Sequence, residues 1–221
     1  SEIDNFTITV LELAPDHTRI VYAWSTNRKN FKERLEAKLT TEHDYYAFCA
    51  RKIRDLMKSF PPLRIGMDSQ QGGIAVMEAL HDPDKIHPGE QFIWPVIVPD
   101  EPKDTDNKAG LHLVELINFA SADWTSEANH GMRKDFEDRV LLFPRFDPIT
   151  IGLAIEDDKR AYDGGDMSRL YDSLEDCVME IEELKNELAM IVMTTTAQSN
   201  RDRWDTPEIK SPTGKKGRLR K

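Results

Sequence analysis

The residue in this sequence best placed to do chemistry is Asp68, which ends the short apolar run LRIGM at residues 63–67. Ser69, two glutamines and two glycines follow it, so the carboxyl group stands directly before a loop of small and polar residues. Reactive groups in α/β sheets gather where strands end, because the loops there are exposed while the strands are rigid. A carboxylate at this point can bind a divalent cation, and Gly72 and Gly73 would let a phosphate or another backbone approach. The alternative is structural: Asp68 or Ser69 caps a helix that begins near Gly73.

A divalent cation takes oxygen ligands from separate chain segments, so Asp68 needs partner acids. Asp4, just before the first expected strand, is one candidate, and its alternative is a solvated acid near the start of the chain. Asp202 and Asp205 in the patch RDRWD are another candidate pair. The acids of residues 99–110 fit a solvated loop better than a ligand set.

Other chemistries lack their motifs. No two histidines have the spacing on one helix face that zinc sites use, and His130 fits a surface helix position. The Gly-Lys pair in SPTGKKG has neither the preceding glycine nor the following Ser or Thr of a Walker A loop. No G-x-S-x-G occurs, so a nucleophile elbow is absent. The sequence therefore argues against zinc, ATP and serine hydrolase sites.

Composition describes an ordinary soluble chain with enough apolar material for a core. The 221 residues are 39% hydrophobic and 32% charged, enough for one large domain or two small ones. No apolar run approaches the roughly 20 residues of a membrane span, and the start SEIDNF lacks the layout of a signal peptide. Cys49 and Cys177 each lie in a helical pattern, which favours core thiols in a reducing compartment over a disulfide.

Charge is distributed unevenly along the chain. The formal net charge is -10, which taken alone argues against phosphate binding. Residues 210–221, however, hold six basic residues and no acid, which leaves -16 on the rest of the chain. Acids clustered in this way either repel DNA or hold cations against it. We expect residues 201–221 to form a basic, flexible segment behind a domain at residues 1–200, and the alternative for the tail is a solvated end.

Periodicity predicts the elements that would position Asp68. The first half contains a hairpin of strands at 6–13 and 18–26, a loop or third strand at 27–41, a helix at 43–60, a strand at 63–67 and a short helix after Gly73. The second half contains a strand near 91–98 with Pro95 at an edge or bulge, an apolar segment from 111, a helical segment at 121–139, a strand at 139–146, a flexible connector at 156–166 and a long helix over about 168–195. A helix between strands implies a parallel pairing. The apolar stripe of the last helix is typical of a helix docked on a sheet.

This order of elements resembles a ribonuclease H-like core, a mixed sheet flanked by helices, here with a long C-terminal helix. Several phrases make the likeness sharper, in this order: DNFTITVLEL, YYAFCARKIRDLMKSF leading into RIGMDSQQGG, ADWTSEANHGMRKDFED before LLFP, and YDSLEDCVMEIEELKNELAMIVMT followed by RDRWDTPE and GKKGRLRK. Together they resemble the nuclease half of a tailed-bacteriophage terminase large subunit over nearly the whole chain.

The resemblance implies a metal-dependent endonuclease that cuts double-stranded viral DNA during packaging, in the host cytoplasm and not in the mature virion. It implies two Mg²⁺ or Mn²⁺ ions held by acids, with Asp68 matching the acid at the end of the central strand and Asp4 matching a neighbouring acid. Its implied partners are the packaging ATPase domain of the same subunit, the portal and the small terminase subunit, with no membrane. Phosphate contacts would come from the basic tail, including Lys215, Lys216, Arg218 and Arg220, and from Lys and Arg on the helices.

The resemblance also implies that two further acids lie just outside these 221 residues, which would leave the fragment weak or inactive. Two other readings stay open. One is a ribonuclease H-like docking module of the packaging motor without catalysis, favoured where fewer than three acids converge near Asp68. The other is an unrelated α/β domain that dimerises through the helix at 168–195.

Overall fold

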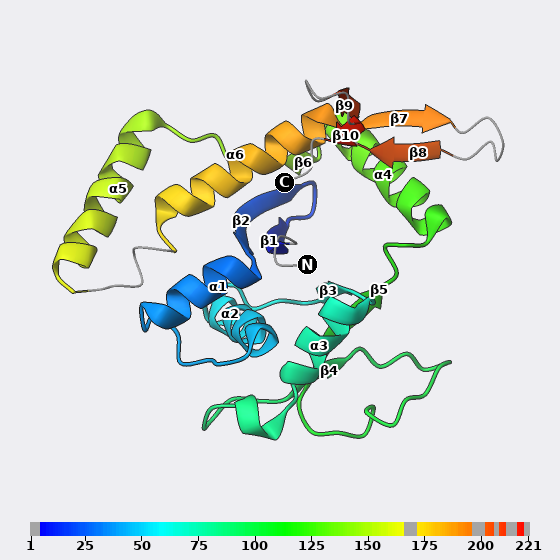
Figure 1. Ribbon diagram of the computed structural model, residues 1–221. Coiled ribbons are helices and arrows are strands. Elements are labelled where there is room, and N and C mark those ends of the chain that lie inside the picture. Colours follow the sequence, from blue (N-terminus) through cyan, green and yellow to red (C-terminus); the bar gives the residue numbers. More distant parts are fainter. Residues whose placement is uncertain (1–4, 166–171, 196–201, 206–207, 211–215, 219–221) are drawn as a thin grey trace. The chain divides into compact units, whose positions relative to one another are not determined.

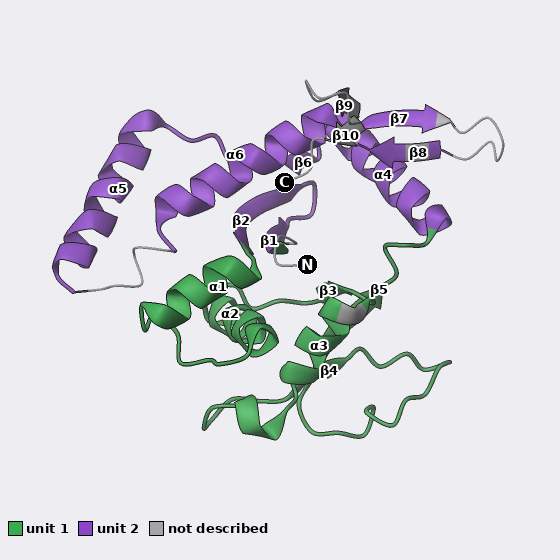
Figure 2. Cartoon of the chain, viewed as in Figure 1, with its two compact units in different colours: residues 1–6, 26–121 green, residues 7–25, 122–221 purple. Residues whose placement is uncertain are grey.

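The computed structural model describes residues 5–165, 172–195, 202–205, 208–210 and 216–218. The protein is a mixed α/β molecule with small sheets and six α-helices among the described residues (Figure 1). It divides into two compact units, one built from residues 1–6 and 26–121 and the other from residues 7–25 and 122–221 (Figure 2). The α/β class predicted from the sequence is confirmed, and the single domain over residues 1–200 stays a prediction.

The first unit contains a parallel sheet. Its strands are β3 (Ile65–Asp68), β4 (Ile93–Pro95) and β5 (Leu111–Ile117), and its helices are α1 (Arg28–Glu36), α2 (Tyr45–Ser59), α3 (Gln71–Ala79) and the 3₁₀ turn η1 (Pro83–Lys85). The strand order is β3-β5-β4, with both pairings parallel and a register irregularity at Trp94/Pro95. The predicted parallel pairing and the position of Pro95 at an edge or bulge are therefore confirmed. The central strand of this described sheet is β5, so β3, which ends in Asp68 and which the resemblance implied to be central, lies at the edge.

Helix α1 replaces the loop or third strand expected at residues 27–41. Asn27 caps it by accepting the backbone N–H of Asn30 at 2.9 Å. Phe31 packs its ring 5.8 Å from that of Tyr45 and 5.3 Å from that of Phe48 on α2, measured between centroids. A single aromatic anchor therefore docks a helix whose other side chains are mostly charged, which explains why no apolar period is visible in the sequence.

Helix α2 supplies much of the core of the first unit. Ala47, Phe48, Cys49, Ala50 and Ile53 are buried along it, as the periodicity predicts. It ends where the chain reaches the proline pair that follows Phe60, because proline restricts the residue before it and donates no N–H.

The second unit holds most of the N-terminal hairpin and the C-terminal half of the chain. Its strands are β1 (Phe6–Leu13), β2 (Thr18–Thr26), β6 (Leu141–Leu142), β7 (Val192–Thr195), β8 (Asp202–Asp205), β9 (Glu208–Lys210) and β10 (Lys216–Arg218), and its helices are α4 (Ala122–Glu137), α5 (Pro148–Asp163) and α6 (Leu174–Met190). Strand β2 lies between β1 and β6 and pairs with β6 in parallel. Strands β7 with β8, and β9 with β10, form two antiparallel pairs.

Two C-terminal predictions change in the structure. The connector expected to be flexible at 156–166 is largely helical, because it belongs to α5. Asp147 caps the start of this helix by accepting the N–H of Thr150. Ion pairs from Arg160 to Glu156 and Asp157 stabilise its last turns. The long helix is shorter than expected: it starts at a capping box formed by Ser173 and Asp176, and the chain re-enters a strand at β7.

Helix α6 docks on β2, as its stripe predicts. Ile181 is buried against Ile20 and Ala23. Two side chains of β2 also donate hydrogen bonds to acids in or near α6. The indole N–H of Trp24 donates to Asp172 at 2.7 Å, and the hydroxyl of Ser25 donates to Glu180 at 2.7 Å. Part of the stripe therefore packs within the second unit, and dimerisation through this helix stays a prediction. Among the described residues, no helix is long and apolar enough to cross a membrane.

Candidate metal site at the end of β3

The predicted site residue Asp68 lies at the carboxyl end of β3. Its Cα is in register with Ile117 of β5, and the next residue, Ser69, still donates its N–H to the carbonyl of Ile117 at 2.8 Å. The ladder therefore holds the backbone on both sides of the carboxylate. The side chain is half-buried, and its Oδ1 accepts the N–H of Gln70 at 3.1 Å. One backbone bond thus orients the carboxylate at the strand end.

The alternative that Asp68 or Ser69 caps the following helix is wrong. Helix α3 has Gln70 as its N-cap, and no side chain caps it. Asp68 instead forms a tight turn with the N–H of Gln70, two residues further along, which is a common conformation for aspartate at the start of a loop. The carboxylate keeps most of its acceptor capacity in this arrangement, because two oxygens can accept about four bonds.

Gly73 is the residue that allows the turn to close. A Cβ built on Gly73 would stand 1.9 Å from the carbonyl oxygen of Asp68, closer than any real contact, whereas one on Gly72 would meet nothing within 4 Å. The first turn of α3 is therefore pressed against the backbone of Asp68. The two glycines look alike in sequence, but only the second is required by packing.

The candidate partners of Asp68 differ in how far the structure describes them. Asp4 lies outside the described part of the chain. No group of three or more His, Cys, Asp or Glu side chains is arranged for a metal ion in residues 5–165 and the described segments that follow. Asp106 in the charged loop accepts the N–H of Lys103 at 2.8 Å and so shapes its own turn.

Asp202 has a partner that sequence reasoning missed. Its Oδ2 lies 3.0 Å from Nε2 of His130 on α4, and the ring of Trp204 meets the His130 ring edge-on at 5.0 Å between centroids. These contacts hold strand β8 to α4 in the second unit. The predicted surface histidine is thus an anchor for the C-terminal hairpin, and residues 72 positions apart gave no sequence signal of it.

The predicted basic tail is only partly described. Lys216 and Arg218 belong to β10, which pairs with β9, while Lys215 and Arg220 lie outside the described residues. Part of the segment expected to be flexible is therefore paired backbone. Its role in binding phosphates stays a prediction.

The sequence did not predict an ion-pair network that joins α2 to the segment between α3 and β4. Arg54 is buried and donates to the carbonyls of Leu80 and Gln91 at 2.5 and 2.9 Å. Arg51 donates to Oε1 of Glu90 at 2.6 Å, and Glu90 also accepts the N–H of His87 at 3.1 Å. Burial alone would raise the pKa of Glu90, but these bonds and the arginine charges hold it below its usual value. The network fixes the chain segment between α3 and β4.

Burial also changes the pKa of a histidine in the first unit, His81. His81 stacks on Trp94 with ring centroids 4.2 Å apart, and burial lowers its pKa. The imidazole is therefore neutral at physiological pH, as a packing residue would be.

Comparison of the chain with known proteins gave no match to a family model, to a curated protein or to a solved structure.

Proposed function

We propose that this chain is a ribonuclease H-like, divalent-metal-dependent endonuclease domain that cuts double-stranded DNA during viral genome packaging, as in the large terminase subunits that its sequence resembles. The observation that carries the proposal is the position of Asp68. A half-buried carboxylate stands at the carboxyl end of a parallel strand, held by one backbone bond, with a glycine pressed against its carbonyl. This is the place in an α/β sheet where a reactive group is both rigid and accessible.

Hard carboxylate oxygens are the ligands that Mg²⁺ and Mn²⁺ prefer, so Asp68 fits as one ligand of such an ion. When bound in pairs, these ions activate water and stabilise the leaving oxygen of a phosphodiester. In the proposal, Asp68 holds the ion and the parallel ladder of β3 and β5 keeps its carboxylate in place. Asp4 is the proposed second ligand, and the ATPase domain, the portal and the small terminase subunit are the proposed partners in the host cytoplasm.

The test is plasmid nicking by the Asp68→Ala variant in Mg²⁺ or Mn²⁺, using protein that includes the flanking segments. We expect nicking to be abolished while the circular dichroism spectrum and the thermal midpoint stay close to wild type. Asp104→Ala is the matched control, since Asp104 is an exposed acid of the charged loop in the same unit. Equal nicking by Asp68→Ala and wild type would refute the metal assignment.

A second candidate function is a docking module of the packaging motor that does not cut. The observation that favours it is the lack of a three-acid group among the described residues. This reading expects no nicking by the wild-type protein in either metal, together with retained binding to the packaging ATPase domain. Metal-dependent nicking that needs Asp68 would exclude it.

A further inference from the structure

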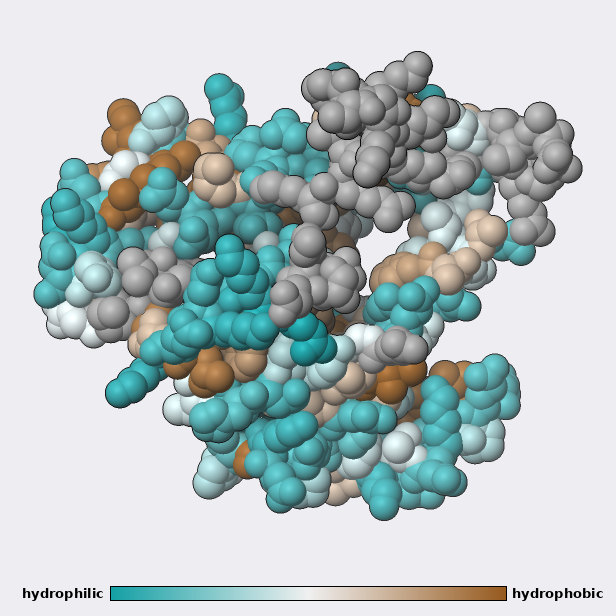
Figure 3. All heavy atoms as spheres, in the orientation of Figure 1, coloured by the Kyte–Doolittle hydropathy of each residue, from teal (hydrophilic) through white to brown (hydrophobic). Residues whose placement is uncertain are grey.

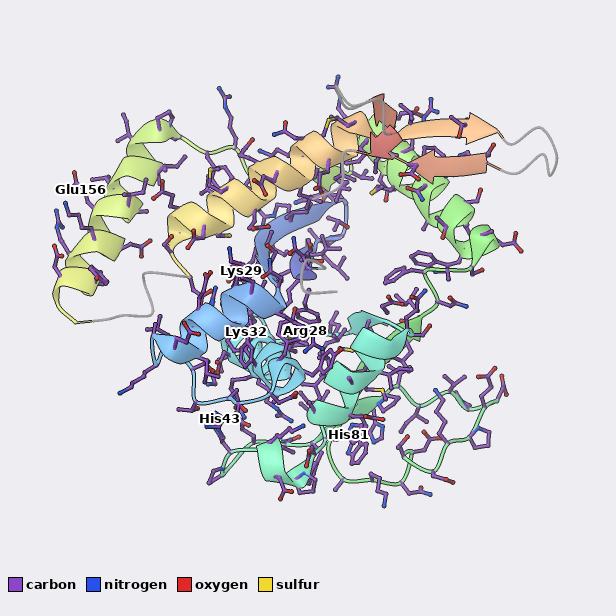
Figure 4. All side chains as sticks on the ribbon, in the orientation of Figure 1. Arg28, Lys29, Lys32, His43, His81 and Glu156 are labelled. Carbon is purple, nitrogen blue, oxygen red and sulfur yellow. The ribbon has the colours of Figure 1, made fainter. Side chains whose placement is uncertain are left out.

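The first unit carries a cationic face on the first two turns of α1. Arg28, Lys29 and Lys32 lie there, within one turn of each other (Figure 4). Residues 28–38 contain five basic and two acidic residues in a chain whose net charge is -10. The side chain of Lys29 is 78% exposed, and its ion pair with Glu33, at 3.8 Å, is long and solvated. This face is therefore a local exception to the acidic character of the chain.

Arg28 is ordered by two aromatic rings. Its guanidinium carbon lies 4.9 Å from the ring centroid of Tyr45 and 5.0 Å from that of Tyr46. Tyr45 is buried and donates its hydroxyl to the carbonyl of Thr26 at 3.3 Å, and burial raises its pKa, so the phenol is neutral. The rings therefore hold the guanidinium without cancelling its charge. A stacked guanidinium keeps its N–H donors in the plane of the group, where they can reach a phosphate oxygen.

The placement of Arg28 and Lys29 opposes the helix dipole. The first turn of α1 contains no acid, although acids are the residues that the positive end of a helix favours. The positive end of the helix dipole disfavours cations in this first turn, where Arg28 and Lys29 lie. Folding alone therefore does not favour this arrangement, whereas an anion bound from outside would be stabilised by the side chains and the dipole together.

The chain segment that carries this face offers little apolar surface to a membrane. In residues 14–62, all of which are described, no large hydrophobic side chain is exposed. The surface over α1 is mostly hydrophilic (Figure 3). Interfacial membrane binding needs buried apolar area in addition to charge, so these residues suit a hydrated polyanion better.

We infer that Arg28, Lys29 and Lys32 form a contact surface for the sugar-phosphate backbone of double-stranded DNA, which they would hold without reading its sequence. The identity of the polyanion rests on the proposed function, while the surface itself rests on the charges and stacking of α1. Contacts to phosphates alone fix position and carry no base information, so affinity depends on salt and not on sequence.

The test compares two double neutralisations in the full chain. Lys29→Gln with Lys32→Gln removes two charges from α1 while keeping good helix formers. Lys103→Gln with Lys108→Gln removes the same charge from exposed positions of the loop in the same unit. Binding to 30-base-pair duplexes of two unrelated sequences is measured by fluorescence anisotropy across a salt series, in EDTA so that metal and cleavage play no part.

We expect the α1 variant to lose about tenfold in affinity for both duplexes, and the slope of log K against log salt to fall by about two. The loop variant should bind like wild type. Equal losses in both variants would mean that only net charge matters, and no loss in the α1 variant would mean that α1 is not a contact; either result overturns the inference. It is also overturned if wild type leaves the duplexes free and sediments with vesicles containing anionic lipid.

The Asp68→Ala nicking assay separates this inference from the proposed function. A protein that binds DNA through α1 but never nicks it supports the surface and refutes the nuclease. A protein that needs Asp68 for nicking, and binds equally well without Lys29 and Lys32, supports the nuclease and refutes the surface.

Discussion

The turn after β3 shows how two residues with different chemistry depend on each other. Asp68 supplies a carboxylate and a carbonyl at the same strand end, and the carbonyl is the atom that Gly73 approaches. A side chain at position 73 would have to displace either the carbonyl or the first turn of α3. The geometry of the carboxylate therefore depends on a residue that has no functional group of its own.

Gly73→Ala should destabilise the protein and disturb the site, whereas Gly72→Ala should do neither. A Cβ 1.9 Å from a backbone oxygen forces the backbone to move, which costs about 2 kcal/mol. A Cβ on Gly72 meets nothing, and alanine improves helix propensity by about 0.5 kcal/mol. Urea unfolding of both variants measures the difference, and plasmid nicking measures its effect on the site. Equal midpoints for the two variants would show that the close approach is not a constraint in solution.

At the scale of elements, burial patterns decided what the sequence could reveal. Helix α2 was predictable because its buried residues recur every three or four positions, and β3 was predictable because its apolar run stops at Asp68. Helix α1 was not, because it is docked by Phe31 and by a buried arginine, Arg34, in place of an apolar stripe. A helix without an apolar stripe cannot be recognised from the spacing of its hydrophobic residues.

The candidate site was predictable in the same uneven way. The position of Asp68 at a strand end followed from local sequence. Its turn with Gln70, and the unequal roles of Gly72 and Gly73, depend on backbone geometry that composition does not encode. The pairs Arg51–Glu90 and His130–Asp202 join residues 39 and 72 positions apart, so only the folded chain could reveal them.

Glu90→Gln should weaken the tie between α2 and the segment that joins α3 to β4. The carboxylate is mostly buried between Arg54 and Arg51, and Arg51 also pairs with Glu42 at 3.6 Å. Loss of the Glu90 charge therefore reduces the negative charge that offsets two arginines, which costs about 2 kcal/mol at neutral pH. The pKa of Glu90 is lowered in the folded state from its usual 4.5, so its stabilisation is present above about pH 4.5 and disappears as the pH falls through the folded value.

Chemical unfolding between pH 3 and pH 7 measures both effects. We expect the Glu90→Gln curve to lie below wild type at pH 7 and to converge on it at low pH. Glu101→Gln, an exposed glutamate of the loop, should follow wild type throughout. A constant gap between Glu90→Gln and wild type over the whole range would mean that the charge of Glu90 contributes nothing.

At the scale of the whole molecule, the described cores of the two units are unequal. Thirteen of the eighteen buried hydrophobic residues belong to residues 26–121, and five belong to the other unit, namely Ile20, Ala23, Trp24, Val178 and Ile181. Hydrophobic burial is the main favourable term in folding, so the first unit has the larger source of stability among the described residues. Each unit also contains one cysteine thiol, that of Cys49 in the first and that of Cys177 in the second.

The two thiols should therefore report on the two units separately. Cys49 is fully buried, and burial raises the pKa of its thiol to about 12, so at pH 8 it should react with a disulfide reagent only after its surroundings open. Cys177 is half-buried against the core of Ile20, Ala23 and Ile181, and should react faster in the native protein. In a urea series, labelling of Cys49 in a Cys177→Ser background should begin at higher urea than labelling of Cys177 in a Cys49→Ser background. Coincident midpoints would show that the units unfold as one, and the reverse order would show that the smaller described core is the more stable.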